Sequence, residues 1–219
     1  MRTNKKLSQK SKGGKRFAFV IDGECEFWYV QMLKKNERTI NVTLEPKLPQ
    51  KKALSEQYNL VVKFSDDYDK VFWIVDFDVI IRETDKAKKG KKTALKEFEE
   101  HYEKLTRKYH EKVTIIINNP CLEYWYLLHF VETSKYFDTY EKLEKELKKH
   151  LANYSKSEKF HTKQNNDIYL QLKPFINTAI TNAKKLSVFD FSNPRSGMTQ
   201  MQLFFETKEM TEIIKHISR

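Results

Sequence analysis

The chain has 219 residues, of which 39% are hydrophobic and 32% are charged, and its formal net charge is +11. This length fits one domain, or one domain with a helical appendage. No apolar run approaches the roughly 20 residues of a spanning helix and no apolar signal core opens the chain, which excludes a membrane protein and predicts a cytoplasmic one. The positive charge favours a polyanionic partner such as nucleic acid.

Cysteine usage points to a reducing compartment. Cys25 and Cys121 are the only cysteines in the sequence. They are too few and too far apart for a disulfide framework or a four-ligand zinc site.

Residues 1–16 predict a flexible basic tail. The segment is dense in Lys, Ser and Gly and has no apolar periodicity. Contact with nucleic acid and a purely solubilising role both fit this composition.

From Phe17 onward, segments typical of strands alternate with segments typical of helices. Short apolar, β-branched runs predict buried strands, and apolar residues three and four apart predict amphipathic helices. The expected strands are 17–21, 39–45, 71–75 and 113–117, and the expected helices are 24–35, 51–64, 93–109 and 121–130.

This alternation predicts an α/β domain over residues 17–135. Its mostly parallel sheet has four strands with helices on both faces. Residues 136–219 show only helical patterns, such as the stripe of Tyr140, Leu143, Leu147 and Leu151. We expect them to form a helical extension packed on the sheet domain.

Acidic side chains follow three of the predicted strands. They are Asp22, Glu24 and Glu26 after the first, Asp76 and Asp78 after the third, and Glu123 after the fourth. The carboxyl ends of strands in such a sheet meet along one crevice, where several carboxylates repel one another unless a cation neutralises them. The pattern therefore predicts a Mg²⁺ or Mn²⁺ site.

Two details of this acidic set depend on local conformation. If Asp76-Phe77-Asp78 stays extended, both carboxylates point the same way and Phe77 points toward the core. Glu123 falls one turn into a predicted helix, where either a place in the site or a favourable interaction with the helix dipole would explain it.

Lysines crowd the segment after the second acidic pair. A predicted loop over residues 82–92 carries Lys86, Lys88, Lys89, Lys91 and Lys92. Such lysines can hold a phosphate backbone without reading its sequence. A solvated loop that only precedes a helix is the alternative.

The sequence blocks around these acids resemble the RloB-like family, Toprim-related proteins found beside bacterial restriction and abortive-infection genes. The family's first block usually reads E-G-x-x-T-E-P-x-Y-F, its second D-x-D and its third S-N-P-x-x-E-x-W-x-L-L-H-F. Here the three blocks read D-G-E-C-E-F-W-Y, D-F-D and N-N-P-C-L-E-Y-W-Y-L-L-H-F. The resemblance covers most of the chain and implies a Toprim-like, Rossmann-like fold.

Toprim nucleases hold Mg²⁺ for phosphodiester chemistry with a Glu after the first strand and a later D-x-D. The resemblance implies that Asp22 takes the Glu position and that Asp76 and Asp78 form the D-x-D. Because Asp is one methylene shorter than Glu, Glu24 or Glu26 is the alternative first ligand. The resemblance also places Lys156 near the site, as a nucleic-acid-binding residue.

The leading hypothesis is a metal-dependent endonuclease that serves as the effector of an anti-phage defence system, with an ATPase as a partner. Its substrate would be RNA, tRNA or DNA, and homo-oligomerisation stays open. A catalytically degenerate nucleic-acid-binding or adaptor protein is the second hypothesis. A phosphoryl-transfer enzyme with a nucleophilic Asp is the third.

Overall fold

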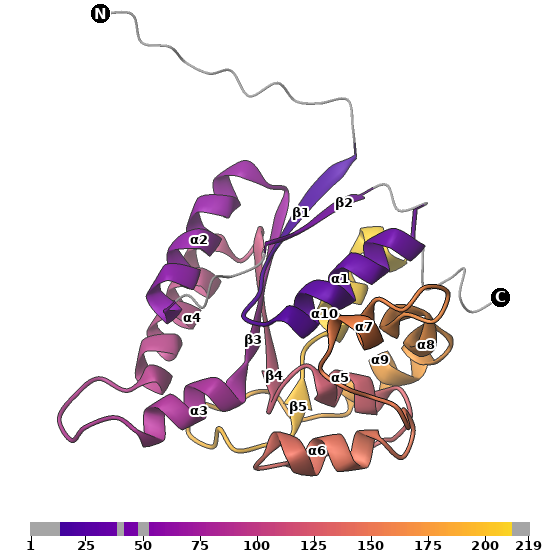
Figure 1. Cartoon of the computed structure of the whole chain (residues 1–219). Helices are drawn as coiled ribbons and strands as arrows, with labels where there is room; N and C mark the ends of the chain where they lie inside the picture. Colours follow the sequence, from indigo (N-terminus) through magenta and orange to yellow (C-terminus); the bar gives the residue numbers. More distant parts are fainter. Residues whose placement is uncertain (1–13, 39–41, 48–52, 212–219) are drawn as a thin grey trace, which may run out of the picture.

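Five strands form one sheet at the centre of the molecule (Figure 1). The structure is a computed structural model that describes residues 14–38, 42–47 and 53–211. The strands are β1 (Lys15–Val20), β2 (Val42–Lys47), β3 (Lys70–Asp76), β4 (Val113–Asn119) and β5 (Met198–Thr199), in the spatial order β2-β1-β3-β4-β5. All neighbours are parallel except β4 and β5. The predicted mostly parallel α/β fold is confirmed.

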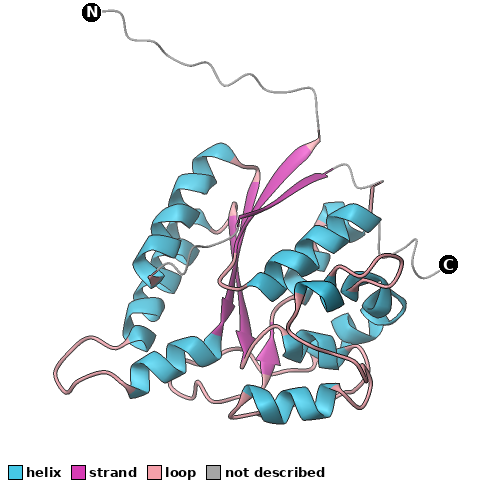
Figure 2. Ribbon diagram, in the orientation of Figure 1, coloured by secondary structure: helices cyan, strands magenta, loops and turns pink. Residues whose placement is uncertain are grey.

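The inner parts of β1, β3 and β4 are mainly apolar because both faces of the sheet are covered (Figure 2). Side chains alternate between the faces: Phe17 and Phe19 of β1 enter one hydrophobic core, and Ala18 and Val20 enter the other. The second core is closed by α2 (Leu54–Asp67), α3 (Phe77–Asp85) and α4 (Ala94–Tyr109).

The helices on the other face come from both halves of the chain. They are α1 (Glu24–Asn36), α5 (Glu123–Leu128), α6 (Tyr140–Leu147), α7 (Glu158–His161), α8 (Ile168–Leu172), the short 3-10 helix η1 (Lys173–Phe175), α9 (Ile176–Lys184) and α10 (Gln202–Phe205). The C-terminal part thus packs directly on the sheet. Phe204 of α10, for example, lies with its ring centroid 5.2 Å from that of Phe19 and 5.1 Å from that of Phe72.

The sequence predicted four strands and no strand after residue 136, and this was wrong. Met198 and Thr199 pair antiparallel with Asn119 and Asn118. The Thr199 hydroxyl donates to Asn118 Oδ1 at 2.6 Å, and the Ile117 amide donates to Gln200 Oε1 at 3.0 Å. A strand of two residues is too short to show an alternating apolar pattern, so the sequence alone could not predict β5.

Several predicted boundaries shift. β1 begins at Lys15, so Lys15 and Arg16 belong to the sheet and not to the predicted tail, whose residues 1–13 lie outside the described part of the chain. The predicted second strand corresponds to β2, and its positions 39–41 lie outside the described residues, as do 51 and 52 of the following helix and 212–219 of the extension. Within the described residues, no helix combines the length and apolarity needed to cross a membrane.

Candidate metal centre

The carboxyl ends of β3 and β4 bring Asp76 beside the start of α5. Asp76 is the last residue of β3 and lies opposite Asn118. Its Oδ1 accepts a hydrogen bond of 2.9 Å from the Leu122 amide, and the Asp78 amide donates to the Pro120 carbonyl at 3.0 Å. These bonds fix the end of β3 against the turn that follows β4.

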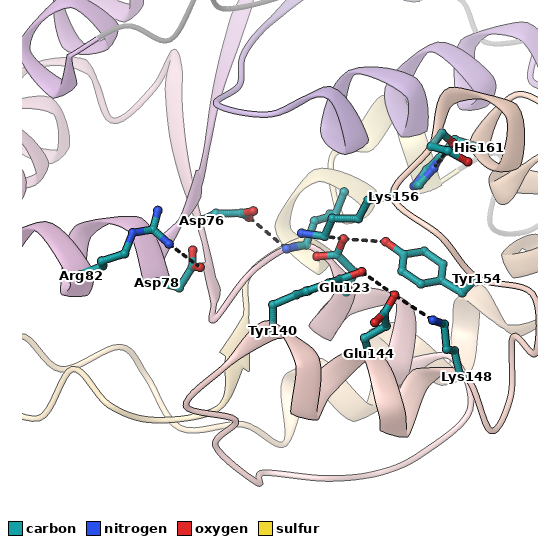
Figure 3. A network of polar contacts seen from close by, with 12 residues as sticks. Asp76, Asp78, Arg82, Glu123, Tyr140, Glu144, Lys148, Tyr154, Lys156 and His161 are labelled. Atoms are coloured by element: carbon teal, nitrogen blue, oxygen red, sulfur yellow. Dashed lines mark hydrogen bonds and ion pairs between the residues drawn. The ribbon is translucent and has the colours of Figure 1, made fainter.

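A set of ligand atoms gathers at this junction (Figure 3). One atom each from Asp76, Cys121 and Glu123 lies within 4.8 Å of the others. Cys121 and Glu123 are buried, whereas Asp76 is only partly buried, so the group meets solvent on its Asp76 side. The two carboxylate oxygens of this compact set are ligands that suit a divalent cation.

Glu26, in the first turn of α1, lies next to these ligand atoms. Its side chain is buried and lies within hydrogen-bond reach of the Asp76 carboxyl. A Cβ atom on Gly23 would clash with Glu26 Oε2, so a glycine at this position lets the carboxylate fold back against the start of the helix. Glu26, Asp76 and Glu123 are called the acidic cluster below.

Burial and mutual repulsion raise the proton affinity of the acidic cluster. Burial, and then the charge of Glu123, raise the pKa of Glu26 to about 7. Burial and the charges of Glu26 and Glu123 likewise raise the pKa of Asp76 well above its usual range. Carboxyl groups this close ionise together only when a cation compensates them.

Glu123 is the most enclosed member of the cluster. Its Oε1 accepts a hydrogen bond of 2.6 Å from the Tyr154 hydroxyl and forms an ion pair of 3.1 Å with Lys156 Nζ. Its Oε2 is buried and has no hydrogen-bond partner among the described residues. An unpaired buried carboxylate oxygen is costly, so an atom that ligates it would stabilise the site.

Lys156 lies beside the acidic cluster and contacts Glu123, away from the lysines that follow α3. Its Nζ is 4.0 Å from the centroid of the Tyr140 ring, a cation–π contact. Burial alone would lower the pKa of Lys156, but Glu123, Cys121 and Asp76 raise it above the ordinary lysine value. The ammonium group is therefore positively charged beside the acids.

Asp22 and Asp78 form an outer pair of carboxylates. Asp22 is half-buried and accepts a hydrogen bond of 3.0 Å from Gln57 Nε2. Burial, and then the nearby charges of Glu83 and Asp78, raise its pKa. Burial also raises the pKa of Asp78, against the opposing effect of Arg82, whose Nη1 is 3.8 Å away.

The segment Asp76-Phe77-Asp78 does not stay extended, so the condition for two parallel carboxylates is not met. α3 begins at Phe77, so Asp76 ends a strand while Asp78 lies in the first turn of a helix. The two carboxylates therefore do not share one face of a strand. Phe77 is buried, as expected, in the core beneath α4.

The alternatives for the first ligand separate in space. Glu26 reaches the acidic cluster, Asp22 lies with the outer pair, and Glu24 is exposed. Sequence reasoning missed Cys121, Tyr154 and Tyr140 as members of the site. Cys121 stands inside the third sequence block that carries the family resemblance, which was the available signal.

The predicted lysine loop is shorter than expected. α3 runs to Asp85, so Arg82 is helical, and the connection to α4 begins at Lys86. Lys86, Lys88, Lys89, Lys91 and Lys92 are all exposed there. Gly90 takes a φ of 82°, the left-handed region that favours glycine, where the Lys91 amide bonds the Lys88 carbonyl.

This lysine loop lies at the far end of α3 from Asp76 (Figure 1). The nine residues of α3 separate the two by about 14 Å along the helix axis. Lys92 pairs with Glu100 of α4 at 2.7 Å. The loop can therefore contact a long polyanion that also reaches the acidic cluster, but not a small phosphate ester bound there.

Sequence comparison identifies the family. Comparisons with curated proteins and with solved structures give no match. The family model described as RloB-like protein matches residues 17–216, which include the whole described sheet except the first residues of β1, together with all residues of the acidic cluster and Lys156. The chain belongs to the RloB-like family.

Proposed function

We propose that this chain is a Toprim-type, metal-dependent nuclease that cleaves phosphodiester bonds of nucleic acid. The observation that carries the proposal is the convergence of Glu26, Asp76 and Glu123 at the carboxyl ends of adjacent strands, with Glu123 Oε2 unpartnered. These oxygens fit Mg²⁺ or Mn²⁺, which take carboxylate ligands and leave positions for water and phosphate oxygens. A bound ion of this kind would supply a polarised phosphoryl oxygen and an activated water.

The residues of the chain would divide the remaining work. The Tyr154 hydroxyl holds the Glu123 carboxylate in place through its 2.6 Å hydrogen bond. The Lys156 ammonium, beside the cluster and partly open to solvent, offers positive charge to a phosphate that enters from the Asp76 side. The outer pair, Asp22 and Asp78, offers carboxylates for a second cation. Such a cation would stabilise the negative charge that develops on the leaving oxygen.

The lysine loop supports a polymeric substrate over a small phosphate ester. Its five exposed lysines follow the C-terminal end of α3. The length of this helix, about 14 Å, separates the start of the loop from Asp76, too far for one small phosphate ester to contact both. Contacts of this kind position a backbone without reading bases. RNA, tRNA and DNA all carry that backbone, and the substrate panel described next distinguishes them.

The test is cleavage of tRNA, single-stranded RNA and duplex DNA with Mg²⁺ or Mn²⁺. We expect cleavage by the wild type that a chelator abolishes and that Asp76→Asn and Glu123→Gln each lose. Asp66→Asn, the same chemical change at an exposed position of α2, is the matched control and retains activity. Cleavage that survives in both site variants would refute the assignment.

A role as effector of a bacterial defence system, restrained by an ATPase partner, is part of the same proposal. The support is membership in the RloB-like family, whose proteins are found beside bacterial restriction and abortive-infection genes. Expression of the wild type is expected to be toxic to a bacterial host and Asp76→Asn harmless, with co-expression of the partner suppressing toxicity. Equal growth of both strains without any partner would argue against an effector.

A non-catalytic nucleic-acid-binding protein is the second candidate, and the Lys156–Glu123 ion pair favours it. An internal ammonium that neutralises the acids removes part of the need for a metal. In that case the protein would bind nucleic acid equally well with and without a chelator and would cleave none of the panel. Metal-dependent cleavage decides between the two candidates.

A further inference from the structure

The acidic cluster contains a donor that magnesium sites do not need. Cys121 Sγ lies within 4.8 Å of the nearest ligand atoms of Asp76 and Glu123. The cysteine is buried and free, at the turn between β4 and α5. Mg²⁺ binds oxygen and has little affinity for sulfur, whereas Zn²⁺ and other borderline-soft ions bind thiolate and carboxylate together.

We propose that Cys121, Asp76 and Glu123 form a site for a thiophilic divalent cation, with Zn²⁺ the best fit. This inference deepens the proposed function, because the same carboxylates would also hold Mg²⁺. Zn²⁺ bound through three protein ligands has a fourth position for water on the solvent side of Asp76. On binding, the Cys121 thiol gives its proton to solvent and a sulfur–zinc bond forms.

A second feature of the site points to an ion independently of the cysteine. Glu123 Oε2 is buried without a partner among the described residues, while Oε1 of the same carboxylate is already bonded to Tyr154 and Lys156. One oxygen is thus held by the protein and the other is left for a ligand. This is the arrangement in which neighbouring groups orient a metal-binding carboxylate.

The consequence is control of the proposed nuclease by the identity of the ion. Zn²⁺ at this site would occupy two of the carboxylates that Mg²⁺ requires and would hold them more tightly because of the added sulfur. Micromolar Zn²⁺ would then silence a Mg²⁺-dependent reaction, and a zinc chelator would restore it. Oxidation of Cys121 would remove the zinc site.

The chain offers its own matched control, since Cys25 is also buried and free. Cys25 lies on α1, one residue before Glu26. Burial, and then the charge of Glu123, raise the pKa of the Cys25 thiol. Cys25 does not belong to the group of ligand atoms around Asp76. Cys25→Ser therefore removes a neighbouring thiol without removing a ligand.

The experiment uses the purified full chain, freed of metal, and titrates it with Co²⁺ and with Zn²⁺. Cobalt bound by a thiolate gives a near-ultraviolet charge-transfer band. We expect this band, and one bound Zn²⁺ per chain, in the wild type and in Cys25→Ser. Cys121→Ser should lose the band and bind Zn²⁺ more weakly by at least about tenfold.

Glu123→Gln is a second test of the site that does not depend on whether Cys121→Ser folds correctly. It keeps the Cys121 thiol and removes a carboxylate ligand. We expect it too to weaken Zn²⁺ binding, with circular dichroism unchanged. Absence of the band in the wild type, or its persistence in Cys121→Ser, would overturn the zinc site. Neither readout needs a substrate.

The inference and the proposed function can therefore fail separately. A cobalt–thiolate band with no cleavage of any nucleic acid would support the zinc site and refute the nuclease function. Mg²⁺-dependent cleavage without a band would do the reverse. In the case where both hold, Zn²⁺ is expected to inhibit wild-type cleavage in competition with Mg²⁺.

Discussion

At the scale of single residues, substitutions of Glu26 and Glu24 are expected to affect Mg²⁺ binding very differently. They lie in the same first turn of α1, but Glu26 is buried within reach of Asp76 and Glu24 is exposed. Glu26→Gln is expected to lower Mg²⁺ affinity and Mg²⁺-dependent cleavage by about 10–100-fold or more, while Glu24→Gln changes both by less than about twofold. Calorimetric titration with Mg²⁺ and initial cleavage rates measure these effects. A larger loss in Glu24→Gln than in Glu26→Gln would reverse the assignment.

The raised pKa of Glu26 also predicts a pH dependence of stability. Burial raises its folded-state pKa from 4.5 to about 7, so between these values the folded state holds a proton that the unfolded state has lost. The wild type therefore loses stability relative to Glu26→Gln as pH rises from 4.5 to 7, by about 2–3 kcal/mol in total without metal. Urea unfolding of both proteins at several pH values with a chelator measures this difference.

Two outcomes test the cause of that pH dependence. Because every titratable group other than residue 26 is the same in both proteins, only the difference between wild type and variant reports on Glu26. Saturating Mg²⁺ is expected to remove the loss of wild-type stability between pH 4.5 and 7, since the cation compensates the carboxylate. A difference that stays constant from pH 4.5 to 8 would show that the buried carboxyl does not titrate as described.

The sequence located most of the acids in the site but not the groups that complete it. Asp76, Glu26 and Glu123 could be predicted because each follows a strand or starts a helix next to one. Tyr154 could not, since it is 31 residues beyond Glu123 and reaches it only through packing of the C-terminal segment. Lys156, which also contacts Glu123, was expected near the site from the family resemblance and not from local pattern. Local pattern carries no information about such a contact.

At the scale of elements, the lysine loop between α3 and α4 predicts how binding depends on salt. Each lysine that neutralises a phosphate releases a counterion, so Lys88→Glu/Lys89→Glu should weaken binding to every nucleic acid sequence alike. The slope of log affinity against log salt is expected to fall in magnitude by about 1–2. Binding is measured by fluorescence anisotropy at several salt concentrations, with a chelator to prevent cleavage.

The matched control for the loop is Lys104→Glu/Lys108→Glu. It makes the same change of charge at exposed positions of α4, beyond the loop. We expect a smaller change in salt slope than for the loop variant. Equal effects of the two variants would mean that net charge, and not the loop, governs binding.

Elements with a strong local pattern were predictable, and elements fixed by distant contacts were not. The helix over 94–109 follows the predicted apolar stripe, because Phe98 and Leu105 are buried in the core and the other apolar residues of the stripe pack against it. β5 and the early start of α3 depend on other segments: Thr199 bonds Asn118, and the Asp78 amide bonds the Pro120 carbonyl. The two partners of each bond lie far apart in the sequence, so a local sequence pattern cannot predict either bond.

At the scale of the whole molecule, the C-terminal segment and the sheet share one hydrophobic core. Phe204 is buried against Phe19 of β1 and Phe72 of β3, although it lies more than 130 residues beyond either. Such packing couples the stability of the sheet to that of the segment which also carries Tyr154 and Lys156. The two parts are therefore expected to unfold in a single transition.

Phe204→Ala tests this coupling. Removal of a buried phenylalanine side chain is expected to lower the free energy of unfolding by about 3–5 kcal/mol, and the loss should be the same when followed by tryptophan fluorescence and by far-ultraviolet circular dichroism. Leu203→Ala, at the neighbouring position where the side chain is 36% exposed, is the control and should cost about 1 kcal/mol or less. Two separate transitions in the wild type, or a variant in which only the C-terminal segment melts, would show that the sheet folds independently. The contacts of Tyr154 and Lys156 with the acidic cluster would then form by docking of two units, because Glu26, Asp76 and Glu123 come from the sheet part and Tyr154 and Lys156 from the other.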